Sequence, residues 1–123
     1  MAGLAAVAVA GCQVPTRAQG ASGTVAEYSF GSVKADLPGR CRVPAVLSAA
    51  DSVLRRRGYS VSAEAVTESE GQVRAQAVGA DSVTVSAVVV PGGTRVGVRV
   101  GLVGDETLSR SILDDVLRLV VGM

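Results

Sequence analysis

The most reactive side chains in this sequence are its two cysteines, and Cys41 is the one placed for thiol chemistry. It directly precedes a predicted helix and lies between Arg40 and Arg42, so the helix N-terminus and both guanidinium groups favour the thiolate form. A catalytic thiol also needs a base, and the sequence contains no histidine. We therefore interpret Cys41 as a small buried or half-buried side chain. An intermolecular disulfide stays open as the alternative.

The other residues capable of acid–base, metal or phosphate chemistry lack the spacing that such chemistry needs. Without histidine, the commonest general base and the commonest metal ligand are both missing. Lys34 is the only lysine, and no Ser-x-x-Lys motif accompanies it. Gly101-x-x-Gly104 is followed by acidic residues that would repel a phosphate. We attribute the carboxylate groups to a hairpin turn, a helix start and a helix flank: Glu64, Glu68 and Glu70; Asp105 and Glu106; Asp114 and Asp115. The sequence therefore predicts a non-enzyme with no catalytic residue, no bound metal and no cofactor.

Arginine supplies nearly all the positive charge and forms the candidate interaction surface. Arg55, Arg56 and Arg57 end a predicted helix, whereas Arg95 and Arg99 point outward from a predicted strand. The first three could contact anionic lipid headgroups. The helix dipole and solvation explain arginines at a helix C-terminus as well. Because the net charge is only +1, no long-range field would attract nucleic acid, and we predict no nucleic-acid partner.

The amino terminus has the order of segments typical of a lipoprotein export signal. The apolar run Leu4–Ala10 is much shorter than the about 20 residues that span a bilayer. The four residues Val9-Ala10-Gly11-Cys12, at the end of this run, resemble the bacterial lipobox. The cysteine of a lipobox is acylated, for example with palmitate, and becomes the mature terminus. Several acyl chains on Cys12 would anchor the protein stably to a membrane.

The N-terminal segments also predict a compartment and the domain limits. Met1-Ala2-Gly3 lacks the basic residues with which signal peptides begin, so translation could start upstream; an Ala-rich cytosolic terminus is the alternative. Gln13, the residue after the cysteine, is compatible with sorting of the lipoprotein to the outer membrane, where it would face the periplasm, if the organism has two membranes. We expect a signal peptide at 1–11, the lipidated cysteine and a flexible tether at 12–27, and a folded domain at 28–123.

Two amphipathic helices are predicted in this domain. The first spans Arg42 to Arg57, with Pro44 in its first turn and Gly58 as its C-terminal cap. Its apolar face is expected to contain Val46, Leu47, Ala50, Val53 and Leu54. The second helix follows Asp105, whose carboxylate can cap it. Its apolar residues are Leu108, Ile112, Leu113, Val116, Leu117 and Val120.

Alternating apolar and polar residues predict five strands joined by short turns. The first runs from about Tyr28 to Leu37. The expected inward rows are Val33, Ala35 and Leu37; Tyr59, Val61, Ala63 and Ala65; Val73, Ala75 and Ala77; Val83, Val85, Ala87 and Val89; and Val96, Val98, Val100 and Leu102. The sequence favours sheet because valine is abundant and aromatic residues make up only 2%.

The predicted fold class is α+β, with a single antiparallel sheet of about five strands and two helices packed on one face, in the order β-α-β-β-β-β-α. The opposite sheet face, which carries Ser, Thr, Gln and Arg, should be solvated.

The residues from Thr94 to Leu113 resemble the closing strand and helix of an uncharacterised family of short bacterial lipoproteins, a domain of unknown function. The likeness extends back through Arg55-Arg-Arg-Gly-Tyr59 and covers roughly residues 31–121; Gly101-Leu-Val-Gly-Asp-Glu106 is its most specific part. The resemblance implies an envelope lipoprotein and supplies no catalytic residues. The topology is also similar to the helix-grip domains of some outer-membrane assembly lipoproteins, an analogy of fold that assigns no function.

Two functions from different classes fit this sequence. The first is a lipid-tethered interaction or scaffold module that docks on another envelope protein through the solvated sheet face or an exposed strand edge. The second is a small carrier that binds an apolar ligand or lipid between the sheet and the helices. The membrane, reached through the lipid on Cys12, is a partner in either case.

Overall fold

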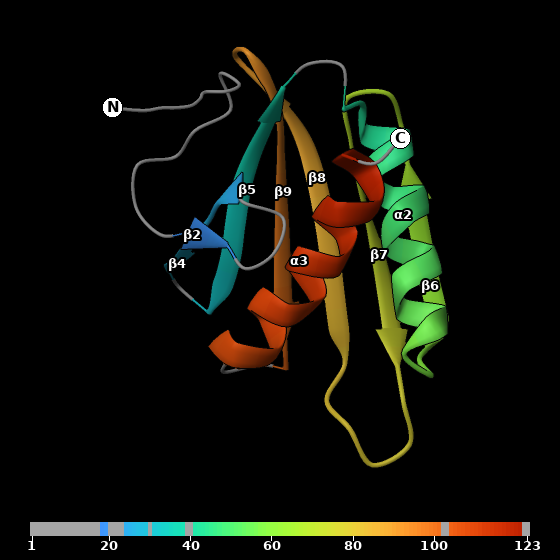
Figure 1. Ribbon diagram of the computed structural model, residues 1–123. Helices are drawn as coiled ribbons and strands as arrows, with labels where there is room; N and C mark the ends of the chain where they lie inside the picture. The colour runs from blue at the N-terminus through green and yellow to red at the C-terminus, as the bar shows by residue number, and fades with distance from the viewer. Residues whose placement is uncertain (1–17, 20–23, 30, 39–40, 102–103, 122–123) are drawn as a thin grey trace.

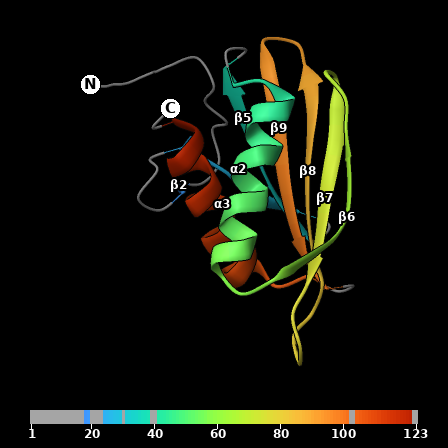
Figure 2. The same ribbon diagram turned by 90° about the vertical axis from the view of Figure 1, so that its right-hand side faces the viewer.

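An antiparallel sheet carries both helices on one of its faces (Figures 1 and 2). The computed structural model describes residues 18–19, 24–29, 31–38, 41–101 and 104–121, so Cys12 lies outside the described residues. The strand order is β4-β5-β9-β8-β7-β6. The strands and helices are β4 (Glu27–Ser29), β5 (Ser32–Pro38), α2 (Val43–Arg56), β6 (Ser60–Val66), β7 (Glu70–Gln76), β8 (Val83–Val90), β9 (Gly93–Val100) and α3 (Glu106–Val121). This arrangement confirms the predicted α+β class, the five long strands and the element order.

The two helices divide the inner face of the sheet between them. Helix α2 contacts β6, β7 and β8, whereas α3 contacts β5 and β9, and the helices also contact each other. The inner rows of β5, β7, β8 and β9 meet the helices as predicted. Their buried members are Val33, Ala35, Leu37, Val73, Ala75, Val83, Val85, Ala87, Val96, Val98 and Val100. Two predicted members are not buried: Val89 is 53% exposed, and Ala77 follows the end of β7 and is only half-buried. Leu102 lies outside the described residues.

Both helix predictions are confirmed. Each helix end that was predicted lies within one residue of the observed end. Helix α2 buries its predicted apolar face, and Gly58 follows it with a φ of +90°. Helix α3 begins at Glu106, where the Leu108 N–H donates to Asp105 Oδ1 at 3.0 Å, so Asp105 is the predicted cap. Among the described residues, no helix has the length and apolar character needed to cross a membrane.

The prediction of one continuous strand from Tyr28 to Leu37 is wrong. The chain forms a hairpin there, with β4 antiparallel to β5 and Tyr28 opposite Val33. Gly31, with a φ of +79°, lies in the connection between the two strands. The residues on both sides of this turn keep the alternation of a strand, so the hydrophobic pattern concealed the reversal.

A β-bulge at Ser62 reverses the second half of the predicted inward row of β6, whereas Tyr59 and Val61, before the bulge, pack against the core as predicted. Val61 pairs with the buried Ala75, but the next paired residue, Ala63, is opposite Arg74. Because one extra residue reverses the alternation, Ala63 shares the outer face of the sheet with Arg74. Beyond the bulge, Glu64 pairs with the buried Val73, so the carboxylate-bearing residue takes the inner-face position that the pattern had given to alanine.

Short strands also occur within the range predicted as a flexible tether. β2 (Ala18–Gln19) pairs with β3 (Thr24–Val25), and Ala26 is fully buried. β3 contacts β5, so packing against the domain begins before residue 28.

Candidate functional site

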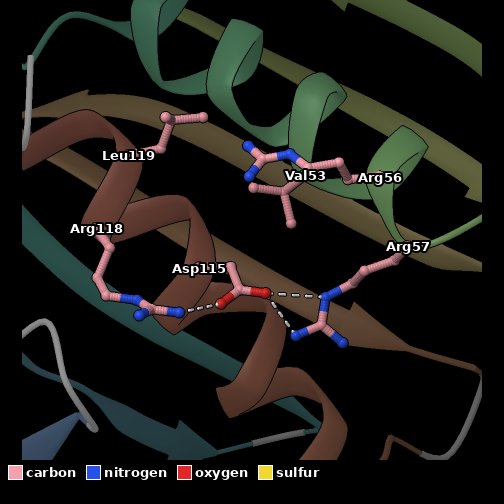
Figure 3. Close-up of a pocket in the computed structure, with 6 residues that line it drawn as sticks. All are labelled: Val53, Arg56, Arg57, Asp115, Arg118 and Leu119. Carbon is pink, nitrogen blue, oxygen red and sulfur yellow. Dashed lines mark hydrogen bonds and ion pairs between the residues drawn. The ribbon is translucent and has the colours of Figure 1, made fainter.

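A groove between α2 and α3 is lined by three arginines and one aspartate, and two of the arginines bind the aspartate (Figure 3). The groove has a volume of about 470 Å³. Its lining residues come from the C-terminal turn of α2, the residue after it and the second half of α3: Val53, Arg56, Arg57, Asp115, Arg118 and Leu119. The groove forms because the α2 chain ends where α3 passes beside it.

Asp115 bridges two of the guanidinium groups. Arg57 donates from Nε at 3.1 Å and from Nη2 at 2.7 Å, both to Asp115 Oδ2. Arg118 donates from Nη2 to Oδ1 at 2.7 Å. Arg57 Nη2 also donates to Ser111 Oγ at 2.7 Å. The carboxylate therefore holds Arg57 and Arg118 in place on either side of it, and the charge-assisted bonds tie the end of α2 to α3.

The charges of this network shift the pKa values of its members. Partial burial raises the pKa of the Asp115 carboxyl, but hydrogen bonds and positive charge from Arg118 and Arg57 outweigh burial, so its pKa is lowered overall from 3.8. The hydrogen bond to Asp115 and the negative charge of Asp114 raise the pKa of Arg118. Asp115 therefore carries its negative charge throughout the neutral pH range.

Replacing Asp115 with asparagine should lower the free energy of unfolding by about 1–2 kcal/mol at pH 7, because two guanidinium groups lose a charged acceptor. Since the folded-state pKa lies below 3.8, the stabilisation is present above that pH and is lost as pH falls through the folded value. Urea unfolding at pH 7 and pH 3 measures this: the difference between D115N and the unaltered chain should shrink at pH 3.

Asp51→Asn is the matched control, because within the described residues Asp51 pairs with Arg55 alone, whose side chain is 61% exposed. An exposed pair one turn apart on a helix contributes at most about 0.5 kcal/mol. A D51N loss as large as that of D115N would mean that the interhelical network has no special role.

Arg56 is the lining arginine that the network does not use. It forms no hydrogen bond or ion pair with any residue in the described part of the chain. Figure 3 shows its side chain extending past Val53 toward Leu119 on α3. Arg55, in contrast, is bound to Asp51 through Nε at 2.7 Å and does not line the groove.

The structure places the five candidate arginines on different elements, as their predicted positions in a helix and a strand imply. Arg56 and Arg57 line the groove, whereas Arg95 and Arg99 lie on the outer face of the sheet. There, Arg95 pairs with Asp36 at 2.7 Å, and Arg99 is opposite Ser32 and Thr84 in the register. The candidate arginines therefore contribute to two distinct polar surfaces.

The other residues considered for chemistry lie at separate places in the structure. Cys41 is 6% exposed and forms no disulfide with any residue that the structure describes. Lys34 is exposed on the outer face, and Glu68 pairs with Arg42. In the described part of the chain, no three Cys, Asp or Glu side chains form a group that could hold a metal ion. Cys12, the predicted lipidation site, lies outside the described residues.

The groove could not be predicted from the sequence, because its central contact joins residues 58 positions apart. Asp115 and Arg118 lie three residues apart on a predicted helix, which is a local signal for an ion pair. Nothing in the spacing indicated that Arg57 from the other helix completes the network.

The outer sheet face is the second polar surface and has a floor of small residues. Lys34, Gly97, Ser86 and Gln72 lie opposite one another across β5, β9, β8 and β7. A neighbouring row on this face contains Ser32, Arg99, Thr84 and Arg74. Both helices lie on the opposite side of the sheet (Figure 2), so neither covers this face.

Comparison with known proteins gives a family but no activity. No curated protein matches this sequence. A family model described as a protein of unknown function (DUF3568) matches residues 1–118, and the chain therefore belongs to that family.

Proposed function

We propose that this chain is a bacterial envelope lipoprotein, anchored through Cys12, whose domain is a non-catalytic interaction module that docks on another envelope protein. The anchor is inferred from the apolar run that ends in Val9-Ala10-Gly11-Cys12. The family match extends over this segment, which supports treating it as a regular part of the protein.

A short tether keeps the domain close to the anchored residue. Ala18, in β2, is six residues after Cys12, a stretch that spans at most about 20 Å when fully extended. β2 pairs with β3, which contacts β5 near one edge of the sheet. A lipid on Cys12 would therefore hold this edge next to the membrane and present the rest of the domain to its neighbours.

The outer sheet face supports docking better than the strand edge does. Ser86 is a small exposed residue at its centre, and the basic side chains of Lys34, Arg74 and Arg99 lie in the same and the neighbouring row. The edge strand β6, in contrast, has a bulge at Ser62 and an inward-facing position occupied by Glu64. Bulges and inward charges both hinder the addition of another strand. We therefore assign the partner to the face.

The carrier function receives less support from the packing. The side chains between the sheet and helices belong to a single cluster of apolar residues, each exposed by 6% or less. Large members such as Leu47, Leu54 and Leu117 fill this layer. The pocket on the outer face, of about 410 Å³, is lined partly by polar residues, including Thr67, Glu70 and Gln72.

Site-specific photo-crosslinking in cells tests the proposal. A photoreactive residue at Ser86, exposed on the outer face, should form a covalent adduct with one envelope protein. The same residue at Ser52, exposed on α2, should not, and C12S should abolish the adduct by removing the anchor. Equal capture from Ser86 and Ser52, or no adduct from Ser86, would contradict docking through the face.

A further inference from the structure

We infer that the groove between α2 and α3 binds a phosphate group, supplied either by the headgroup of an anionic lipid or by a free phosphate anion. The binding of phosphate itself depends only on the groove. Its assignment to a lipid headgroup rests on the proposed function, because the anchor would place the domain at a membrane surface.

The groove has an excess of positive charge. Its lining contains three guanidinium groups and one carboxylate, that of Asp115. Asp114, which is 3.6 Å from Arg118 Nε, reduces the excess without cancelling it. The C-terminus of α2 adds the equivalent of only about half a negative charge. The arginines therefore exceed what the helix end and the two aspartates neutralise.

Hydrogen-bond donors remain available on guanidinium groups that are already held in position. Arg57 uses Nε and Nη2 for Asp115 and Ser111, which leaves Nη1 without a partner among the described residues. Arg118 likewise uses Nη2 for Asp115, and all the donors of Arg56 remain. Planar guanidinium groups match phosphate oxygens in pairs, and fixing them beforehand reduces the entropy lost on binding.

The shape and lining of the groove also suit a phosphate-bearing ligand. Its volume of about 470 Å³ lies within the range of small-molecule sites. Val53 and Leu119 form an apolar wall beside the arginines (Figure 3). This combination suits a phosphate attached to an apolar group. Polybasic recognition of a membrane usually uses four to eight cations without a defined pocket, so three arginines in a groove indicate a local site.

The test uses the full chain with C12S, so that no acyl chain on Cys12 contributes to membrane binding. Cosedimentation is measured with vesicles of phosphatidylcholine, with and without phosphatidylglycerol. The neutral vesicles correct for any binding by the apolar N-terminal run. In parallel, inorganic phosphate is titrated while the NMR signals of the arginine Nε–H groups are followed.

Arg56→Gln should weaken binding to the phosphatidylglycerol vesicles about fivefold, the factor that corresponds to roughly 1 kcal/mol for one basic residue at such a surface. Arg55→Gln removes the same charge one residue away and should change binding less than twofold, because Arg55 is held by Asp51 outside the groove. Thermal unfolding of R56Q should match that of the unaltered chain, since Arg56 has no partner in the described structure.

The possible outcomes distinguish failure of the site from binding of a different ligand and from failure of the anchor. Equal losses for R55Q and R56Q would indicate diffuse attraction and would overturn the site, as would the absence of any response to vesicles and phosphate. Shifts of the Arg56 and Arg118 signals with inorganic phosphate, without preference for anionic vesicles, would support the site with free phosphate as its ligand. Because C12S lacks the anchor, failure here leaves the proposed lipoprotein anchor untouched.

Discussion

Replacing Gly104 with alanine is expected to lower the free energy of unfolding by about 3–5 kcal/mol, the combined cost of a strained backbone and a local clash. Gly104 has a φ of +100°. A Cβ there would lie 2.6 Å from Tyr28 Oη, 2.7 Å from the Gly31 carbonyl oxygen and 2.8 Å from Gly31 Cα. Two of these atoms are backbone, so the β4–β5 hairpin would have to move.

Gly79→Ala provides the comparison for this change. Gly79 also has a positive φ, +72°, but a Cβ there meets nothing within 4 Å. Its cost should be about 1–2 kcal/mol, from the backbone conformation only. Chemical unfolding of both variants measures the difference. Similar losses for G79A and G104A would show that the close packing of the hairpin against Gly104 contributes nothing.

The second large effect is expected at Leu117, which is fully buried between α3 and the sheet. Leu117→Ala removes apolar atoms from a filled layer and leaves a cavity, so it should cost about 2–5 kcal/mol. A domain of this size is stable by only about 5–15 kcal/mol, and the variant should therefore melt well below the unaltered chain. Calorimetry measures the change in Tm.

Leu119 provides a matched control on the same helix. It is only partly buried and lines the groove between α2 and α3. Leu119→Ala removes the same atoms where solvent can occupy the space, so its cost should be about 1 kcal/mol. If L119A destabilised the protein as much as L117A, the packing that places Leu117 in the core and Leu119 at its margin would be incorrect.

The helices and the central strands could be predicted from the sequence because their patterns are local. The spacing of apolar residues along α2 and α3 predicted which helix faces are buried, and Asp105 indicated the start of α3. The segment with the most specific family resemblance, Gly101 to Glu106, has a structural explanation in its described residues. Gly101 and Gly104 have positive φ values, and Asp105 caps the helix.

The hairpin, the bulge and the groove could not be predicted because each depends on pairing rather than on pattern. The reversal near Gly31 keeps a strand-like alternation, and the bulge at Ser62 appears only in the register against β7. The contact between Arg57 and Asp115 exists because α2 and α3 share one sheet face, a relation that no local spacing encodes. The candidate arginines at the end of α2 were identified from the sequence, but the residues that they contact are determined by the fold.

The central claim is that Cys12 carries a lipid that holds the domain in a bacterial envelope. The most direct measurement is the intact mass of the protein extracted from membranes, expressed from its native gene with the upstream sequence included. The account predicts the mass of a chain that begins at an acylated Cys12. An unprocessed chain without acyl groups would contradict it, would remove the argument for an envelope partner, and would leave an α+β domain of the DUF3568 family with an arginine-lined groove.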